Sequence, residues 1–324
     1  MRALVTGGTG FIGYHLIQEL LARNWKIKCL VRETSVIPEE YMDKIEFVTG
    51  DLTRPASLTG ITENIDVIFH LAGKIKALNL SEFKKVNTEG TKNLLESIPQ
   101  SQQASIRFIF ISSMSALGPA TTREPLSEEQ SATPVSYYGQ SKLLAENLVR
   151  NSGLNYRIIR PAAVYGPGDK ETLSFFQLAA KHINAKIGLK QHYLSLIHVL
   201  DLVNLIMKAT LTDIKDQVYH AADNSDGYAY SKIIQTAAKS INSWTLSVYI
   251  PQFLLKIAAY FASLWSKLSG QVSIFNLDKY NEIKQQYWLI NSRKAQNQLN
   301  FKPEYDIRRG FAETVQWYQK QGWI

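Results

Sequence analysis

Short apolar runs alternate with amphipathic segments along the first half of the chain. The runs are rich in Val, Ile and Phe, and the segments between them carry apolar residues every three or four positions. Such runs are typical of strands buried on both faces, and such segments are typical of helices that cover a sheet. The pattern predicts an α/β fold with a doubly wound parallel sheet. Its predicted strands are Arg2–Thr6, Lys26–Val31, Ile45–Thr49, Val67–Leu71, Arg107–Ile111 and Tyr156–Arg160.

A glycine-rich turn joins the first predicted strand to the first predicted helix, Tyr14–Asn24. Glycines let a backbone turn sharply and approach a pyrophosphate, and the N-terminus of a helix offers free N–H groups to an anion. A strand, this turn and a helix in succession predict a dinucleotide site. Its predicted cofactor-binding residues are Gly7, Gly10, Phe11, Ile12 and Gly13.

The end of the second strand indicates which dinucleotide is bound. Val31 is followed by Arg32, with no Asp or Glu at the strand end itself. A guanidinium suits a 2′-phosphate better than a free hydroxyl, so NADP is predicted over NAD. Glu33 offers a carboxylate one residue later and keeps NAD as the alternative. The other interpretation of Arg32, as an ordinary solvated loop residue, is the less favoured one.

Small and polar residues follow the third and fourth strands. Asp51 comes after the third strand, and the pair Ala72–Gly73 comes after the fourth. Ligands of an open parallel sheet bind at the carboxyl ends of its strands, so these residues are predicted near the adenine and the phosphates. Asp51 is equally suited to cap a helix that follows it, and the two roles are compatible.

A tyrosine and a lysine lie four residues apart in the predicted helix Tyr137–Asn151. Tyr138 and Lys142 would share one helix face, and a nearby ammonium lowers the pKa of a phenol. The pairing suits proton transfer, although the same spacing also arises on solvated helices. Ser113 adds a hydroxyl at the end of the fifth strand, on the edge where ligands bind.

Asn87 stands in the middle of the predicted helix Ser81–Ser97, where asparagine is a poor helix former. Its amide either bonds to backbone, opening a local kink or holding a water, or is a satisfied surface group.

Composition narrows the class of protein. The net charge of +8 comes from scattered Lys and Arg without a basic block, so no nucleic-acid partner is predicted and a phosphate-bearing ligand suffices. The single cysteine, Cys29, lies in an apolar run and predicts a buried thiol in a reducing compartment. Met1 leads directly into a strand, so no signal peptide is expected and the cytoplasm is the predicted location. His70 and His198 are predicted to be structural, or to support residues of the site from behind, rather than to bind a metal, and no metal site is predicted.

The second half of the chain alternates less regularly. Its most apolar stretch, Tyr249–Leu268, is too short and too charged to cross a membrane. The stretch has a helical stripe that suits core packing, a substrate lid, or a surface that contacts a membrane or partner. Core or lid is the favoured interpretation, and peripheral membrane contact is kept open.

Taken in order, the motifs resemble those of the extended short-chain dehydrogenases/reductases, also called the NAD-dependent epimerase/dehydratase family. The resemblance covers most of the chain. The matching segments are Thr6–Gly13, Asp51–Leu52, His70–Gly73, Asn87, Ser112–Ser113, Tyr138–Lys142, Arg160–Asp169 and Ile197–Val203.

The resemblance implies a Rossmann fold and a set of catalytic roles. Ser113 would hydrogen-bond the reacting substrate oxygen, and Tyr138 would exchange its proton. Lys142 would hold the nicotinamide ribose and depress the pKa of the tyrosine. Asn87 would support the helix or its water.

Further residues and a partner follow from the same resemblance. Leu52, Leu71 and Pro161 would line the cofactor. Family members often pair through helices corresponding to Ser81–Ser97 and Tyr137–Asn151, so a homodimer is expected.

One departure narrows the chemistry. Members that dehydrate nucleotide sugars have an Asp-Glu pair after the catalytic hydroxyl residue, whereas this chain has Met114–Ser115. The segment Leu30–Ser35 is similar to the dihydroflavonol-reductase-like and 3β-hydroxysteroid-dehydrogenase-like branches, which favours oxidation or reduction of a released small molecule.

The sequence therefore predicts an NAD(P)-dependent oxidoreductase that acts on a carbonyl/alcohol pair of an apolar or ring-bearing substrate. The alternatives are a nucleotide-sugar epimerase with retained NAD and a nonenzymatic NAD(P)-binding regulatory or assembly protein. Residues 1–165, with returns near 195–222, are predicted to form the dinucleotide-binding domain. Residues 166–324 are predicted to form a smaller, mostly helical substrate lobe interleaved with the sheet.

Overall fold

A seven-stranded sheet runs through the computed structural model, which describes residues 1–269, 273 and 275–324. The strand order is β11-β6-β5-β4-β1-β2-β3, and β1 to β6 pair in parallel. The order runs outward from β1 in both directions, so the predicted doubly wound α/β class is confirmed. The strands are β1 Arg2–Thr6, β2 Lys26–Val31, β3 Glu46–Thr49, β4 Val67–His70, β5 Arg107–Ile111, β6 Asn155–Pro161 and β11 Gln217–Ala221.

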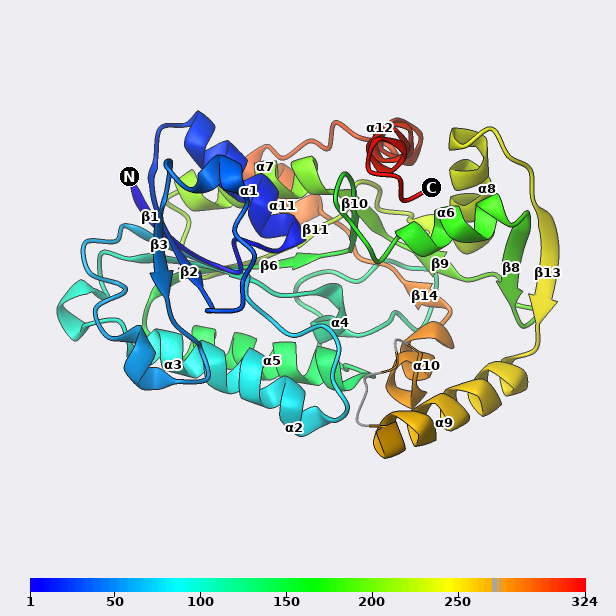
Figure 1. Cartoon of the computed structure of the whole chain (residues 1–324), viewed down its shortest axis with the longest axis horizontal. Coiled ribbons are helices and arrows are strands. Elements are labelled where there is room, and N and C mark those ends of the chain that lie inside the picture. Colours follow the sequence, from blue (N-terminus) through cyan, green and yellow to red (C-terminus); the bar gives the residue numbers. More distant parts are fainter. Residues whose placement is uncertain (270–272, 274) are drawn as a thin grey trace. The chain divides into compact units, whose positions relative to one another are not determined.

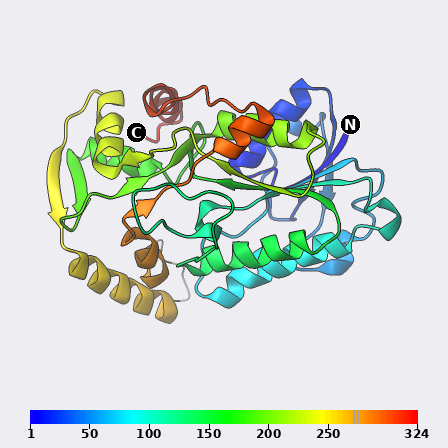
Figure 2. The same ribbon diagram turned by 180° about the vertical axis from the view of Figure 1, so that it is seen from behind.

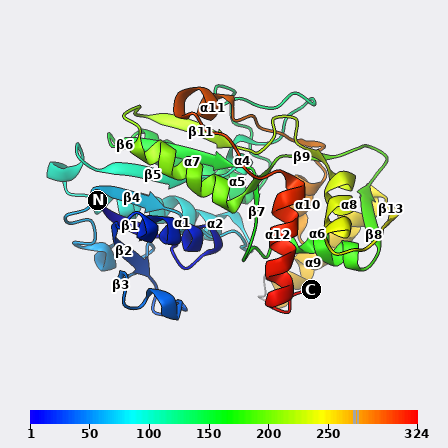
Figure 3. The same cartoon turned by 90° about the horizontal axis from the view of Figure 1, so that it is seen from above.

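Helices cover both faces of this sheet. The helices α1 (Phe11–Ala22) and α7 (Val199–Leu211) lie on one face, and α3 (Gly90–Glu96) and α5 (Tyr137–Arg150) lie on the other (Figures 1 and 2). Figure 3 looks onto the face that carries α1 and α7. Between sheet and helices the strands bury continuous apolar runs; β4, for example, is buried at every position. That burial explains why the strands read as unbroken hydrophobic segments.

The helix predicted over Ser81–Ser97 is one helical run with a wider turn inside it. It begins as α2 (Leu80–Phe83), continues as a π-helix over Lys84–Glu89 and ends as α3. π-turns of this kind arise where a side chain enters the hydrogen-bond ladder, and Asn87 lies in the middle of this one.

The chain divides into two compact units. The first comprises Met1–Ala116, Tyr137–Arg160 and Val203–Tyr219; the second comprises Leu117–Ser136, Pro161–Leu202 and His220–Ile324. The second unit has its own apolar core, in which Phe176 and Phe311 are fully buried. Its helices are α6 Leu173–Ala180, α8 Tyr230–Ser240, α9 Gln252–Ser269, α10 Leu277–Ile283, α11 Arg293–Leu299 and α12 Ile307–Lys320. Its strands are β7 Ala163–Tyr165, β8 Ile183–Ile187, β9 Tyr193–Leu194, β10 Leu196–His198, β12 Tyr228–Ala229, β13 Leu246–Ile250 and β14 Tyr287–Trp288.

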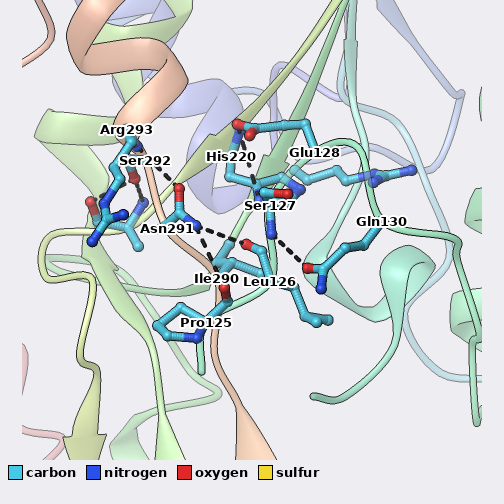
Figure 4. A network of polar contacts seen from close by, with 12 residues as sticks. Pro125, Leu126, Ser127, Glu128, Gln130, His220, Ile290, Asn291, Ser292 and Arg293 are labelled. Carbon is cyan, nitrogen blue, oxygen red and sulfur yellow. Dashed lines mark hydrogen bonds and ion pairs between the residues drawn. The ribbon is translucent and has the colours of Figure 1, made fainter. Parts of the chain in front are cut away.

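A long loop follows the short helix α4 (Met114–Leu117) and is fixed by polar contacts within the second unit, as Figure 4 shows. The Leu126 nitrogen donates to the Leu289 oxygen at 3.0 Å, and the Asn291 nitrogen donates to the Leu126 oxygen at 3.1 Å. The His220 nitrogen donates to the Glu128 carboxylate at 2.8 Å. These hydrogen bonds fix the loop over residues 118–134 to its neighbours in the second unit.

The most apolar helix of the second unit turns its large side chains outward. On α9, Phe253, Phe261, Trp265 and Leu268 are 62–77% exposed, whereas Ala259 is fully buried. The interpretation of this stripe as core packing is therefore wrong. Within the part of the chain that the structure describes, no helix is both long and apolar enough to cross a membrane.

Candidate active site

The glycine turn after β1 is shaped by residues that can carry no side chain. Gly7 has a φ of +75°, in the left-handed region that other residues rarely adopt. A Cβ at Gly7 would lie 2.6 Å from the Ala72 nitrogen, and a Cβ at Gly13 would collide with the Gly7 carbonyl oxygen. The turn, the β4 end and the start of α1 approach one another this closely only because these positions are glycine.

The first turn of α1 provides donors at this turn. Phe11 and Ile12 are the first two residues of α1 and are half-buried. The N–H groups of a helix's first turn have no intrahelical partner, and the cap residue Gly10 offers no side chain to bond them. A backbone-walled cradle with free donors and no obstructing Cβ fits a dinucleotide pyrophosphate.

The ends of β2 and β3 bring charged groups together. Arg32 follows β2 and is exposed, and its backbone nitrogen donates to Ser35 Oγ at 3.1 Å. The Asp51 carboxylate accepts hydrogen bonds from the nitrogen and the Oγ1 of Thr53, both at 2.8 Å. These bonds, led by that of the Thr53 backbone, lower the pKa of Asp51 together with the cations of Arg54 and Arg32.

The predicted helix cap at Asp51 needs a correction. The helix that follows is the 3₁₀ turn Pro55–Leu58, and its cap residue is Arg54. Asp51 instead closes a short turn on Thr53, two residues on. Leu52 is buried and lies against Gly90, where an added Cβ would be 3.1 Å from the Leu52 Cβ.

A chain of hydrogen bonds runs from β1 through β4 to the π-helix. Thr6 Oγ1 lies 2.7 Å from His70 Nδ1, and His70 Nε2 lies 2.9 Å from Thr91 Oγ1. Thr91 in turn donates to the Asn87 carbonyl oxygen at 2.6 Å. Burial lowers the pKa of His70 to about 3, with a further contribution from the Lys142 cation, so the ring is neutral. His70 thus connects β1 to α3 through its two ring nitrogens.

Asn87 joins two elements through its side chain. Its Nδ2 donates to the Lys74 carbonyl oxygen at 3.0 Å and to Ser141 Oγ at 2.9 Å, and its Oδ1 accepts from the Lys74 nitrogen at 2.7 Å. Ser141 Oγ donates to the Tyr138 carbonyl oxygen at 2.8 Å. Asn87 is therefore a buried, fully engaged amide that fixes the loop after β4 against the first turn of α5. The interpretation as a surface asparagine is wrong.

The two serines after β5 differ in their surroundings. Ser112 is buried and donates through Oγ to Glu146 at 2.5 Å. Ser113 is half-buried, and its Oγ accepts a hydrogen bond from the Ser115 nitrogen at 3.1 Å. Because that bond uses an acceptor lone pair, the Ser113 hydroxyl keeps its hydrogen available for donation.

Lys142 extends from α5 to the end of β5. Only 3% exposed, it donates through Nζ to the Ile111 carbonyl oxygen at 2.6 Å. Burial lowers the pKa of Lys142 to about 7, an effect that the Glu146 carboxylate partly offsets. Gly73 adjoins it, since a Cβ at Gly73 would lie 3.3 Å from Asn87 Oδ1 and 4.0 Å from Lys142 Nζ.

Tyr138 precedes Lys142 by one helical turn. It is half-buried, and its ring centroid lies 6.0 Å from that of Phe83 on α2. The ends of β4 and β5 and the first turns of α5 are thus joined by contacts through Gly73, Asn87 and Lys142. Pro161 is the last residue of β6, two residues beyond the pairing of Ile159 with Ile111.

A buried ion pair beneath this site was not predicted from the sequence. Arg160 donates to Glu146 through Nε at 2.9 Å and through Nη2 at 2.7 Å, and the two side chains are 3% and 0% exposed. Glu146 lies four residues after Lys142, so the available signal was a Tyr-x₃-Lys-x₃-Glu spacing along one helix face. Among the described residues, no group of three or more His, Cys, Asp or Glu side chains could hold a metal ion.

Comparison with known proteins identifies the family. The profile described as "NAD dependent epimerase/dehydratase family" matches residues 3–234. The chain is 32% identical over 320 residues to a ceramide reductase of Caulobacter vibrioides, covering 99% of this chain and 95% of that protein. It is 29% identical over 327 residues to a UDP-glucose 4-epimerase of Vibrio cholerae, covering 97% and 94%.

A solved structure shares the fold. The dTDP-glucose 4,6-dehydratase of Bacillus anthracis, crystallised in complex with NAD, superimposes with a TM-score of 0.78 at 20% identity, covering 99% of this chain and 97% of that one. The resemblance inferred from the motifs is therefore confirmed. The chain belongs to the NAD-dependent epimerase/dehydratase family of extended short-chain dehydrogenases/reductases and is an enzyme of the oxidoreductase or epimerase type.

Proposed function

We propose that this enzyme transfers hydride between NADP and a carbonyl/alcohol pair on an amphiphilic lipid, with Tyr138 as the general acid and base. The observation that carries the proposal is the buried Lys142, which lies one helical turn after Tyr138. Its Nζ donates a hydrogen bond to the Ile111 carbonyl oxygen at the end of β5. A buried ammonium without a bound carboxylate is costly, so its retention beside a tyrosine points to proton chemistry.

The chain's own residues would divide the work as follows. Ser113 would donate to the substrate oxygen and stabilise the negative charge that develops there. Tyr138 would give a proton to that oxygen in reduction or take it in oxidation, and the Lys142 ammonium would favour the phenolate. Asn87 would act as a positioning residue, because it fixes the first turn of α5 through Ser141. A bound nicotinamide supplies or accepts the hydride.

The cofactor would lie along the carboxyl edge of the sheet. Gly7, Gly10, Phe11, Ile12 and Gly13 are proposed to hold its pyrophosphate on the backbone cradle. The residues proposed to surround the rest of it are Asp51, Leu52, Leu71, Ala72, Gly73, Lys142 and Pro161. Arg32 supports NADP over NAD. Its cation, like that of Arg54, lowers the pKa of Asp51 at this sheet edge, and no carboxylate stands at the end of β2 to bind a ribose hydroxyl.

The substrate class is suggested by two observations. The ceramide reductase relative matches nearly the whole chain, and Met114–Ser115 lacks the acid pair that sugar dehydration requires. A ketone in a ceramide-like lipid is therefore the first substrate proposed, and a sterol-like ring ketone is the second. The epimerase relative keeps one rival in view, a nucleotide-sugar epimerase with retained NAD.

Steady-state oxidation of NADPH and of NADH tests this proposal, using ketone forms of a ceramide and of a sterol, with UDP-glucose as the third substrate. We expect turnover with NADPH and a lipid ketone, and a loss of NADPH preference in Arg32→Ser. In Tyr138→Phe, turnover falls by about 10²- to 10⁴-fold while NADPH binding is retained, because only the transferable proton is lost. Tyr137→Phe, an exposed neighbour on the same helix, is the control.

Three results would contradict parts of the proposal separately. Unchanged turnover in Tyr138→Phe would overturn the proton role. Tightly retained NAD with UDP-glucose interconversion would establish the epimerase. Equal use of NADH and NADPH by the wild type would contradict the proposed role of Arg32 in binding the 2′-phosphate of NADP.

The location and the assembly of the enzyme are also proposed. The buried thiol of Cys29 supports a reducing compartment, and we place the enzyme in the cytoplasm. We also propose a homodimer formed through α5 and the helical run 80–96. The first domain, residues 1–165 with returns near 195–222, is proposed to bind the dinucleotide, and residues 166–324 to bind the substrate.

A further inference from the structure

The helix α9 has its large and small residues on the opposite sides from those expected of a soluble protein. At 100° per residue, its large apolar side chains fall on one face, and that face is exposed. The opposite face carries Ala259 and Ser266, which are buried. The exposed face is made of Phe253, Ile257, Tyr260, Phe261, Trp265 and Leu268, each 49–77% exposed. A contiguous apolar face of this size marks an interaction surface.

The apolar surface continues beyond the helix. The strand β13, which leads into α9, exposes Leu246 and Tyr249 at 63% and 57%. Leu189, in the loop after β8, is 95% exposed. This loop adjoins α9, because the Gly188 nitrogen donates to the Ile250 oxygen at 2.9 Å and a Cβ at Gly188 would lie 3.5 Å from the Gln252 side chain. Figure 1 shows β13 beside β8 and continuous with α9.

Lysine is the only charged residue type in the chain segments that form this surface. Residues 172–200 and 227–277 contain seven lysines and no Asp, Glu or Arg. Lys186 Nζ lies 5.1 Å from the Tyr249 ring centroid. A small hollow beside it is lined by Lys186, Lys190, Gln191 and Ser231, which are suited to bind phosphate oxygens.

We propose that the face formed by α9, β13 and the loop 188–190 docks the enzyme on a bilayer that contains anionic phospholipid. Aromatic and aliphatic side chains with flanking lysines are the composition of interfacial helices, and the lysines complement lipid phosphates. A second copy of this chain is disfavoured because a two-fold contact would set the lysines of these segments against the same lysines of the other copy. The inference does not rest on the proposed substrate, although docking would bring the enzyme to membrane lipids.

Co-sedimentation with lipid vesicles tests the docking surface. The full-length protein is mixed with vesicles of phosphatidylcholine alone, or of equal parts phosphatidylcholine and phosphatidylglycerol. We expect binding to the anionic vesicles to be at least about tenfold stronger and to weaken as salt is raised. The double variant Phe261→Ser/Trp265→Ser should lose binding by about tenfold or more, because it removes two inserted aromatic side chains.

Two further variants make the result specific. Leu211→Ser/Ile214→Ser removes exposed apolar side chains at and after α7 and should bind like the wild type. Lys186→Glu/Lys190→Glu should lose binding to anionic vesicles while retaining NADPH binding and melting temperature, which shows that the fold is intact.

The proposal is overturned if the wild type does not sediment with anionic vesicles, or if Phe261→Ser/Trp265→Ser binds them equally well. It is also overturned if that variant converts a dimer to a monomer without any vesicle binding by the wild type, since the surface would then be an interface between copies. Loss of turnover on a water-soluble ketone, with no vesicle binding by the wild type, would identify α9 as a substrate lid instead.

Discussion

Lys142 shows how one side chain is set for chemistry by its surroundings. In a solvated helix its pKa would stay near 10.5, but burial lowers the value to about 7. Glu146 on the same helix favours the ammonium, and His70 on β4, whose pKa Lys142 helps to lower, stays neutral. The Ile111 carbonyl oxygen accepts a hydrogen bond from Lys142 Nζ. Tyr138, one turn earlier, would experience whichever charge Lys142 carries, so the two groups are expected to titrate as a pair.

The pH dependence of Lys142→Met follows from this coupling. In reduction, the wild type should lose kcat/KM as pH rises above about 7, where Lys142 loses its proton and no longer stabilises the phenolate that Tyr138 forms. In Lys142→Met, which lacks the ammonium, the alkaline limb of the pH profile should move toward the ordinary tyrosine pKa of about 10. The rate should fall by about 10²- to 10⁴-fold. Lys92→Met, on the exposed part of α3, is the control. An alkaline limb that stays near 7 in Lys142→Met would contradict the assignment.

The same variant has a readout that is independent of catalysis. The pKa of Lys142 is lower in the folded chain than in the unfolded chain. Below about pH 7, where the buried ammonium is present, its destabilising contribution to the folded state is at its maximum. Between there and 10.5 the unfolded chain binds more protons, and wild-type stability should rise with pH. This rise should be absent from the melting curves of Lys142→Met.

At the scale of elements, Glu146 connects β5, α5 and β6 beneath the site. It accepts hydrogen bonds from Ser112 and Arg160 and is itself 0% exposed. Removal of one partner from a buried ion pair leaves the other charge without compensation. Glu146→Ala should therefore lower the free energy of unfolding by about 3–5 kcal/mol, measured by urea denaturation.

Two variants separate this effect from a general loss of charge. Glu96→Ala removes a carboxylate from the exposed pair with Lys92 and should cost less than about 1 kcal/mol. Glu146→Leu/Arg160→Met removes both buried charges and should cost less than Glu146→Ala alone. Equal stability of Glu146→Ala and the wild type would show that the pair does not hold the elements together.

The elements also show which features can be predicted from the sequence. The glycine turn and the Tyr138–Lys142 pair are local patterns, in which spacing along the chain fixes spacing in the structure. The pairing of Glu146 with Arg160 joins residues 14 positions apart on different elements, and no local spacing reveals it. The stripe on α9 has the same helical period whether it faces a core or water, so periodicity identified the face but not what covers it.

At the scale of the whole molecule, the proposed homodimer can be tested on one helix. Leu144 on α5 is 38% exposed, and α5 packs beside α2 and α3 in the pair of helices proposed to form the interface. In light scattering after size exclusion, the wild type should show twice the mass of one chain. Leu144→Glu should show a single chain, because a two-fold contact would bury two opposed carboxylates. Leu211→Glu on α7, 48% exposed on the other face of the sheet, should remain dimeric. A wild type that elutes as a monomer, or a dimer that Leu144→Glu leaves intact, would place any self-association on a different surface.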